Sequence, residues 1–263
     1  MSTEPPADKA TRETVTQVQR WTDKLFSFRT TRPQGYDFTP GQYARLGLQN
    51  DGDTIWRAYS MTSAPQSNSL EFYGTAVPGG LFTSCLKHLK PGDSIFVEKQ
   101  VYGFMTPDRF VDGEDLWMCA TGTGIGPFIS MLRDPSVWRQ FRNLVIVHGV
   151  RHADELSWRN TLLALQNKPP SEMPHARLHV IETVTREPAS MSSANLLHGR
   201  ITTLLRNGLL EKQAGLPITV DASRIMMCGN PDMIEDMRYL LHQRGMRPCR
   251  RTLPGQFVTE NYW

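Results

Sequence analysis

An apolar segment runs directly into a glycine-rich turn in Leu116-Trp117-Met118-Cys119-Ala120-Thr121-Gly122-Thr123-Gly124-Ile125-Gly126-Pro127. Five consecutive apolar residues are typical of a parallel strand that is buried on both faces. The glycines stand at alternate positions, and Pro127 occupies the place of the third glycine in the usual dinucleotide fingerprint. Residues 128–133 then have helical spacing. We therefore predict a strand, a tight turn and a helix whose free N–H groups face the phosphates or ribose of a nucleotide.

The alternation of strand and helix continues toward the end of the chain. Apolar runs and helical spacing predict buried strands at 144–150, 178–184 and 225–228, and helices at 154–166, 201–210 and 232–243. A last strand is predicted at 256–260. Strands that alternate with helices in this way favour a doubly wound parallel sheet.

The pattern before residue 107 is different. Short alternating strands separated by turn residues are predicted at 11–21, 25–30, 43–48, 55–60, 70–77 and 94–98. Asn50-Asp51-Gly52-Asp53 is a hairpin signal between two of them. Strands at this spacing, with one short helical piece, indicate an antiparallel barrel. We expect two domains, an antiparallel β-barrel over residues 1–106 and an α/β domain over residues 107–263.

Composition limits the classes of function. The 263 residues carry a net charge of +3, which is too small to indicate nucleic acid as a partner. The four cysteines are scattered and form no CxxC pair, so no metal or iron–sulfur site is expected. No apolar run approaches the roughly 20 residues that span a bilayer, and the polar N-terminus lacks the order of a signal peptide. We expect a cytoplasmic monomer with no membrane partner.

A cation, an aromatic ring and a hydroxyl follow one another in Arg57-Ala58-Tyr59-Ser60. Because successive side chains alternate along a strand, Arg57 and Tyr59 would share one face of the sheet. An anionic, planar ligand would suit that face, with phosphate at the guanidinium and a ring against the phenol. The alternative is an ordinary surface pair on a strand.

Glycines precede a helix start at Val77-Pro78-Gly79-Gly80, where Thr83 and Ser84 open the helix. Backbone can approach a ligand closely at glycine, and the free N–H groups of a first turn attract an anion. The sequence therefore predicts a phosphate site here, with a well-capped helix as the alternative.

Three arginines follow the predicted strands of the α/β domain or lie in the loop after them. Arg151 ends one strand, Arg186 follows the next after Thr185, and Arg200 lies in the loop beyond. Ligands gather at the carboxyl ends of parallel strands, and converging guanidiniums need a multivalent anion between them. The 2′-phosphate of NADP(H) would meet that need, and three independent surface arginines are the alternative. His148 is read as a satisfied sheet histidine without a role.

These motifs together resemble one family, the bacterial-type ferredoxin/flavodoxin–NADP⁺ reductases, over nearly the whole chain. The resemblance rests on seven stretches in the family's order: Arg57-Ala58-Tyr59-Ser60, Val77-Pro78-Gly79-Gly80 with Thr83-Ser84, Ala120–Pro127, His148-Gly149-Val150-Arg151, Gly199-Arg200-Ile201, Cys228-Gly229-Asn230-Pro231 and Glu260-Asn261-Tyr262-Trp263. It implies a barrel that binds FAD and an α/β domain that binds NADP(H).

The resemblance also implies roles for individual residues. Around FAD, Arg57 would hold a phosphate, Tyr59 would stack on the isoalloxazine and Ser60 would bond near flavin N5. The other residues that it places at FAD are Ala58, Tyr73, Phe82, Thr83, Ser84, Thr121 and Thr123, the last two between flavin and nicotinamide. The residues that it places at NADP(H) are Val150, Arg151, Thr185, Arg186, Arg200 and Asp232. Cys228 would lie beside the nicotinamide.

The aromatic terminus has a role of its own in the resemblance. In bacterial members with such an extension, one ring covers the isoalloxazine and the final ring meets the adenine, so Tyr262 and Trp263 are assigned to these places in either order. Glu260 would stand near the nicotinamide and relay protons. Because nicotinamide cannot stack on a covered flavin, the terminus would have to move before reaction.

The function implied is electron transfer between NADPH and ferredoxin or flavodoxin, which are acidic carriers. Hydride would pass to flavin N5 and single electrons would leave to the carrier. Two alternatives stay open: a reductase component of an oxygenase or cytochrome system, and a flavin-binding redox sensor without turnover.

Overall fold

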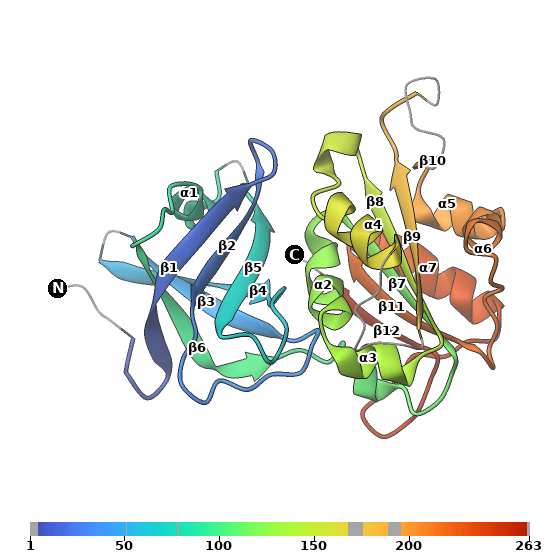
Figure 1. The fold of residues 1–263 in the computed structure, drawn as a ribbon, viewed down its shortest axis with the longest axis horizontal. Coiled ribbons are helices and arrows are strands. Elements are labelled where there is room, and N and C mark those ends of the chain that lie inside the picture. Colours follow the sequence, from blue (N-terminus) through green and yellow to red (C-terminus); the bar gives the residue numbers. More distant parts are fainter. Residues whose placement is uncertain (1–4, 51, 78, 168–175, 189–195, 262–263) are drawn as a thin grey trace. The chain divides into compact units, whose positions relative to one another are not determined.

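The structure, a computed structural model, describes residues 5–50, 52–77, 79–167, 176–188 and 196–261. The chain forms two compact units, which are described separately below. The first comprises Met1–Thr106 and Ile129–Asp134, and the second comprises Pro107–Phe128 and Pro135–Trp263. Each unit is built on one six-stranded sheet (Figure 1).

The sheet of the first unit is antiparallel throughout. Its strands are β1 (Ala10–Arg20), β2 (Leu25–Thr31), β3 (Tyr43–Asn50), β4 (Asp53–Ser60), β5 (Ser69–Thr75) and β6 (Ser94–Tyr102). Their order is β4-β3-β6-β1-β2-β5. An antiparallel bridge from Met61, just after β4, to Phe72 in β5 joins the two edges of the sheet. The antiparallel barrel predicted from the short alternating strands is confirmed, and its helix α1 spans Leu81–Lys87.

Alternation along the strands builds the core of this barrel. In β3, Ala44, Leu46 and Leu48 are buried in one apolar cluster, while Arg45 between them is exposed. Phe28 of β2 and Phe72 of β5 meet in the same cluster, with their ring centroids 5.4 Å apart. The period of two in the sequence therefore separates an apolar interior from a polar exterior, as strand geometry requires.

The sheet of the second unit is parallel throughout. Its strands are β7 (Asp115–Thr121), β8 (Asn143–Val150), β9 (Arg177–Val184), β10 (Leu196–His198), β11 (Ser223–Gly229) and β12 (Phe257–Asn261), in the order β10-β9-β8-β7-β11-β12. Every residue of β8 is buried, as expected for a strand covered on both faces.

Helices cover both faces of this parallel sheet. The helical segments after residue 106 are η1 (Pro107–Arg109), η2 (Gly122–Ile125), α2 (Gly126–Leu132, most of which belongs to the first unit), α3 (Pro135–Gln140), η3 (Ala153–Glu155), α4 (Arg159–Asn167), α5 (Ile201–Arg206), α6 (Leu209–Ala214) and α7 (Pro231–Gln243). In Figure 1, α5, α6 and α7 lie on one side of the sheet and α3 and α4 on the other. Apolar residues of α5–α7 form one cluster with alternate residues of the strands. The doubly wound α/β fold is confirmed.

Some local elements differ from the expectation. The helix predicted at 154–166 is two pieces, η3 and α4. The helix predicted at 201–210 is also split, because Gly208 has a φ of +70° and separates α5 from α6. Two elements, α3 and β10, were not predicted. β10 has only three residues, which are too few to show a period of two. Of the helices in the described part of the chain, none has both the length and the apolar character needed to cross a membrane.

Candidate functional site

Arg57 and Tyr59 lie on the same face of β4. In the ladder with β3, Arg57 stands opposite Leu46 and Tyr59 opposite Ala44, and both partners belong to the barrel core. Side chains of opposed residues point to the same face, so the arginine and the tyrosine share the inward face of the strand. Arg57 is nevertheless exposed, and its Nη1 donates to the Trp56 carbonyl at 2.8 Å. An exposed cation therefore shares this face of the strand with a half-buried aromatic ring.

The Tyr59 ring is fixed by its neighbours. Its centroid lies 5.7 Å from that of Phe82, with the rings tilted by 36°. Gly74 of β5 leaves room for it, because a Cβ at that position would lie 2.6 Å from Tyr59 Cε1. Burial raises the pKa of the Tyr59 phenol, with a smaller opposing effect from Arg57, so the ring carries no charge at neutral pH. The position thus offers a neutral, flat aromatic surface.

The other residues predicted at FAD are distributed over both faces of the barrel. Ser60 is buried and stands opposite Tyr43, while Ala58 is exposed opposite Arg45. Tyr73 is buried in β5, on the opposite side of that strand from its neighbour Gly74. The structure therefore does not bring Tyr73 onto the face that carries Tyr59.

The loop before α1 uses the hydroxyls that were predicted for phosphate. Thr83 Oγ1 lies 3.0 Å from the Val77 carbonyl and 3.1 Å from the Gly80 carbonyl. Ser84 Oγ donates to the same Gly80 carbonyl at 2.8 Å. Both hydroxyls therefore hold the loop against the helix, and Phe82 is buried below it against Tyr59. Pro78 lies outside the described residues.

The three arginines of the second unit come from the ends of three neighbouring strands. Arg151 follows β8 directly, Arg186 follows β9 by two residues, and Arg200 lies two residues after β10. Since β8, β9 and β10 are consecutive in the sheet, their carboxyl ends lie along one edge. All three arginines are exposed, whereas Val150 is buried in a small apolar cluster with Val184.

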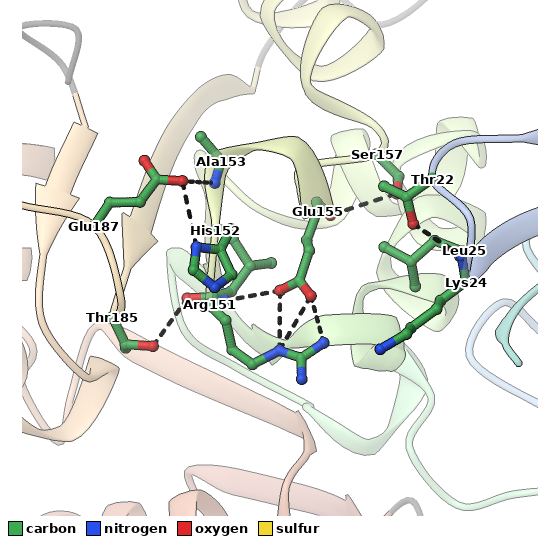
Figure 2. Close-up of polar contacts among 11 residues, drawn as sticks. Thr22, Lys24, Leu25, Arg151, His152, Ala153, Glu155, Ser157, Thr185 and Glu187 are labelled. Carbon is green, nitrogen blue, oxygen red and sulfur yellow. Dashed lines mark hydrogen bonds and ion pairs between the residues drawn. The ribbon is translucent and has the colours of Figure 1, made fainter. Parts of the chain in front are cut away.

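Backbone bonds extend the pairing of β8 and β9 past the ends of the strands. The Thr185 N–H donates to the Val150 carbonyl at 3.1 Å, and Thr185 Oγ1 lies 3.3 Å from the same oxygen. The Arg186 N–H donates to the Arg151 carbonyl at 2.9 Å. A further hydrogen bond joins the same two segments, in which the Glu187 carboxylate accepts from the Ala153 N–H at 2.6 Å (Figure 2). These bonds hold the two arginine-bearing loops together.

A carboxylate that the sequence analysis missed binds Arg151. Glu155 accepts from Arg151 Nε at 3.1 Å, from Nη2, and from the Arg151 N–H at 2.9 Å (Figure 2). Burial would raise the pKa of Glu155, but the hydrogen bonds from Arg151 outweigh it and lower that pKa. The signal in the sequence was the four-residue spacing of the two residues. Within the described part of the chain, no carboxylate lies at ion-pair distance from Arg186 or Arg200.

The glycine-rich turn after β7 packs against the turn after β11. Thr121 Oγ1 accepts from the Asn230 N–H at 2.8 Å. A Cβ on Gly124 would lie 2.4 Å from the Cys228 carbonyl, so only glycine allows this approach. Thr123, in the same turn, is half-buried. Asn230 also caps α7, because its Oδ1 accepts from the Asp232 N–H at 2.8 Å. Asp232 itself is exposed in the first turn of that helix.

Cys228 and Glu260 are neighbours in the parallel ladder of β11 and β12. Cys228 stands between Ala120 of β7 and Glu260 of β12 and is fully buried. Burial raises the pKa of the Cys228 thiol, and the adjacent Glu260 adds to this, so the thiol stays protonated. Burial also raises the pKa of Glu260 to about 7. This carboxyl can therefore take up or release a proton near neutral pH. Tyr262 and Trp263 lie outside the described residues.

The raised pKa of Glu260 predicts a specific pH dependence of stability. The carboxyl has an ordinary pKa of about 4.5 and about 7 in the folded protein, so the folded state binds the proton more tightly. The contribution to stability is full below pH 4.5 and is lost as pH rises through 7, with a slope of at most about 1.4 kcal/mol per pH unit. Urea unfolding from pH 5 to 8 should show this loss in the unmodified protein and not in Glu260→Gln. A Glu235→Gln variant, altered on the exposed face of α7, should keep the unmodified slope.

Comparison with known proteins agrees with this geometry. Residues 13–101 match the family model described as an oxidoreductase FAD-binding domain, and residues 118–239 match the oxidoreductase NAD-binding domain. The flavodoxin/ferredoxin–NADP reductase of Shigella flexneri is 41% identical over 250 residues, which cover 95% of this chain and 97% of that protein. The chain belongs to the ferredoxin/flavodoxin–NADP reductase family.

Other members of the reductase family support the assignment over the same span. The ferredoxin–NADP reductase of Pseudomonas aeruginosa is 36% identical, with 94% of this chain and 95% of that protein covered. A crystal structure of a ferredoxin NADP⁺ reductase from Neisseria gonorrhoeae, with bound FAD and NADP, superposes with a TM-score of 0.89 at 33% identity. The matched region covers 96% of this chain and 98% of the Neisseria gonorrhoeae chain.

The residues present fit the two cofactors of this reductase family. The exposed Arg57 and the neutral Tyr59 ring suit an anionic group joined to a planar one. Exposed Arg186 and Arg200, without ion-pair partners in the described chain, suit a phosphate. The first unit thus has the chemistry of a flavin site and the second that of a phosphorylated dinucleotide site.

Proposed function

We propose that the protein transfers electrons between NADP(H) and ferredoxin or flavodoxin through bound FAD. The observation that carries this proposal is the relationship to flavodoxin/ferredoxin–NADP reductases over 95% of the chain, across both domains. The proposed domains are a FAD-binding barrel over residues 1–106 and an NADP(H)-binding α/β domain over residues 107–263. We propose that the protein acts as a monomer.

The barrel holds the flavin in this proposal. Arg57 binds a phosphate of FAD, Tyr59 supports the ring from one side, and Ser60 positions the reacting edge. Bound FAD supplies the conversion between two-electron hydride transfer and one-electron steps. The neutral Tyr59 phenol favours this role, because a phenolate would repel the electron-rich reduced ring.

The carboxyl edge of the parallel sheet holds NADP(H). Arg186 and Arg200 bind the 2′-phosphate, and Arg151, Val150 and Thr185 form the adjoining wall. Cys228 lies beside the nicotinamide, and Glu260 holds or releases a proton there, which its pKa of about 7 permits. The terminal Tyr262 and Trp263 complete the proposal as the aromatic cover of the flavin.

A spectroscopic titration tests the proposal. The purified protein should show the absorbance of an oxidised flavin, lose it rapidly on addition of NADPH, and lose it slowly with NADH. Addition of ferredoxin and cytochrome c should restore the absorbance and reduce the cytochrome. A flavin that NADPH does not reduce would point instead to a sensor without turnover, and a colourless protein would exclude a flavoenzyme.

The arginines at the sheet edge give the coenzyme preference. Loss of a charge-assisted phosphate contact costs about 1.5–3 kcal/mol, so Arg186→Ala and Arg200→Ala should each lower kcat/KM for NADPH about 10- to 100-fold. NADH lacks the 2′-phosphate, and its kcat/KM should change little. Steady-state rates with both coenzymes measure the ratio.

A control for this prediction lies on the same helix as Arg200. Arg206 is exposed in the last turn of α5, at the other end of that helix, and Arg206→Ala removes the same charge. It should leave the ratio of the two coenzymes unchanged. If Arg186→Ala and Arg200→Ala behave like this control, the two arginines do not bind the 2′-phosphate.

A further inference from the structure

His148 is buried in the centre of the parallel sheet and reaches the glycine-rich turn. It lies in β8 with 1% of its surface exposed, between Ala120 of β7 and Glu182 of β9. Its Nε2 is 3.0 Å from the carbonyl oxygen of Gly122, the first residue after β7. This buried histidine therefore makes a directed contact to the turn.

The chemistry of the contact fixes the protonation of the ring. A carbonyl oxygen can only accept, so Nε2 must carry the proton. Burial lowers the pKa of His148 to about 4, against smaller opposing effects from Gly122 and Glu155, so the ring is neutral at pH 7. His148 is consequently a single tautomer with hydrogen on Nε2 and none on Nδ1.

The contact sets the orientation of one peptide group in the turn. In a trans peptide the carbonyl and the following N–H point in opposite directions. Because the Gly122 carbonyl is directed at His148, the Thr123 N–H is directed away from it. Gly122 has a φ of +55°, where glycine tolerates alternative peptide orientations at little cost. A donor on the carbonyl therefore adds a restraint from β8 to a peptide that lies within η2.

The rest of the turn is held by β11, which lies on the other side of β7 from β8. The Asn230 N–H donates to Thr121 Oγ1, and Gly124 packs on the Cys228 carbonyl, both contacts coming from the end of β11. β8 and β11 flank β7 on its two sides. The turn is thus clamped by β11 at Thr121 and Gly124, and by His148 of β8 at the peptide between them.

We propose that His148 is a positioning residue for NADP(H), which holds the Gly122–Thr123 peptide so that the Thr123 N–H and side chain face the coenzyme. This inference rests on the proposed function, in which NADP(H) binds at the carboxyl edge of the parallel sheet, and on the expectation from the sequence that the glycine-rich turn faces the phosphates or ribose of the nucleotide.

Calorimetry with two ligands on the flavin-loaded protein tests the proposal. NADP⁺ spans the turn, whereas adenosine 2′-monophosphate carries only the adenosine and 2′-phosphate. His148→Leu should weaken NADP⁺ about 5- to 10-fold, the effect of one lost hydrogen bond, and leave adenosine 2′-monophosphate within about twofold. His148→Gln can donate from its own Nε2 and should recover most of the affinity. His179→Leu, on β9 opposite Val145 and far from the strand's carboxyl end, is the control and should change neither affinity.

A second measurement needs no ligand. Nitrogen NMR of the imidazole should show the Nε2–H tautomer of His148 from pH 6 to 8, and the Thr123 amide should exchange faster in His148→Leu than in His148→Gln. An Nδ1–H tautomer, or equal exchange in both variants, overturns the proposal. An equal loss of affinity for both ligands in His148→Leu also overturns it, because that result would mean that the substitution disturbs the fold and not the turn alone. If the unmodified protein does not prefer NADP⁺ to NAD⁺, the proposed function fails instead, and the NMR result still decides the role of His148 in the turn.

Discussion

Gly74→Val is expected to be purified with little or no flavin. A Cβ at residue 74 would lie 2.6 Å from Tyr59 Cε1, so the tyrosine ring must leave its position. Overpacking of this kind costs about 1–3 kcal/mol, and the ring support of the flavin is lost with it. Affinity for FAD should fall on the order of 10- to 100-fold or more. The ratio of flavin to protein absorbance and a fluorescence titration with FAD measure the effect.

Gly47→Val is a matched control for this substitution. Gly47 is also a strand glycine beneath an aromatic ring, since its Cβ would lie 3.0 Å from the Trp56 ring. It alternates with Leu46 in β3 and so lies on the other face of the sheet from Tyr59. The control should lose stability and keep FAD. Equal flavin content in the two variants would show that Tyr59 does not support the flavin.

Glu71→Ala should cause the largest loss of stability. The Glu71 carboxylate is buried, pairs with Arg29 Nε at 3.0 Å and with Arg133, and accepts from Thr62 Oγ1 at 3.1 Å. Only the carboxylate is buried, since the Arg133 and Arg29 side chains are 26% and 45% exposed, so the cost should lie at the lower end of that for a buried pair, about 3 kcal/mol. The same region is joined by a bond from Ser130 Oγ to the Ser63 carbonyl at 2.7 Å. Urea unfolding followed by flavin release and circular dichroism measures the change.

The control for Glu71 is an ion pair of the same charges on the surface. Arg142 and Glu114 lie 3.6 Å apart with side chains 77% and 65% exposed. Exposed pairs contribute little, so Glu114→Ala should change the unfolding free energy by less than about 1 kcal/mol. A loss in Glu71→Ala no larger than this would mean that water compensates Arg133 after the substitution.

Features that depend on nearby residues were predictable from the sequence. The shared face of Arg57 and Tyr59 follows from their spacing of two in a strand, and the turn at Gly122–Gly126 follows from glycines after an apolar run. The neighbouring strands β8 and β9 place Arg151 and Arg186 at one edge, as the alternation of strands and helices suggested. Arg200 follows β10, which was not predicted. These predictions needed only local geometry and the rules for parallel sheets.

Features that depend on distant contacts were not predictable. His148 was given no role, because its contact is to a carbonyl 26 residues away that only the β7–β8 register brings near. The space that Gly74 leaves for Tyr59 was missed for the same reason. Thr83 and Ser84 are predicted at the pyrophosphate; their hydroxyls bond the Gly80 carbonyl of their own loop, a local contact of the kind that hydroxyl side chains commonly make.

The bond between Glu155 and Arg151 determines the direction from which an anion can approach. A guanidinium presents two edges that can each hold an oxyanion with two hydrogen bonds. Glu155 occupies the edge formed by Nε and Nη2, which leaves the edge that contains Nη1 (Figure 2). Arginine at this position can therefore serve two anions at once, each from a fixed side. A lysine there would carry the same charge, but its ammonium group lacks two separate planar edges and could not hold both anions in this way.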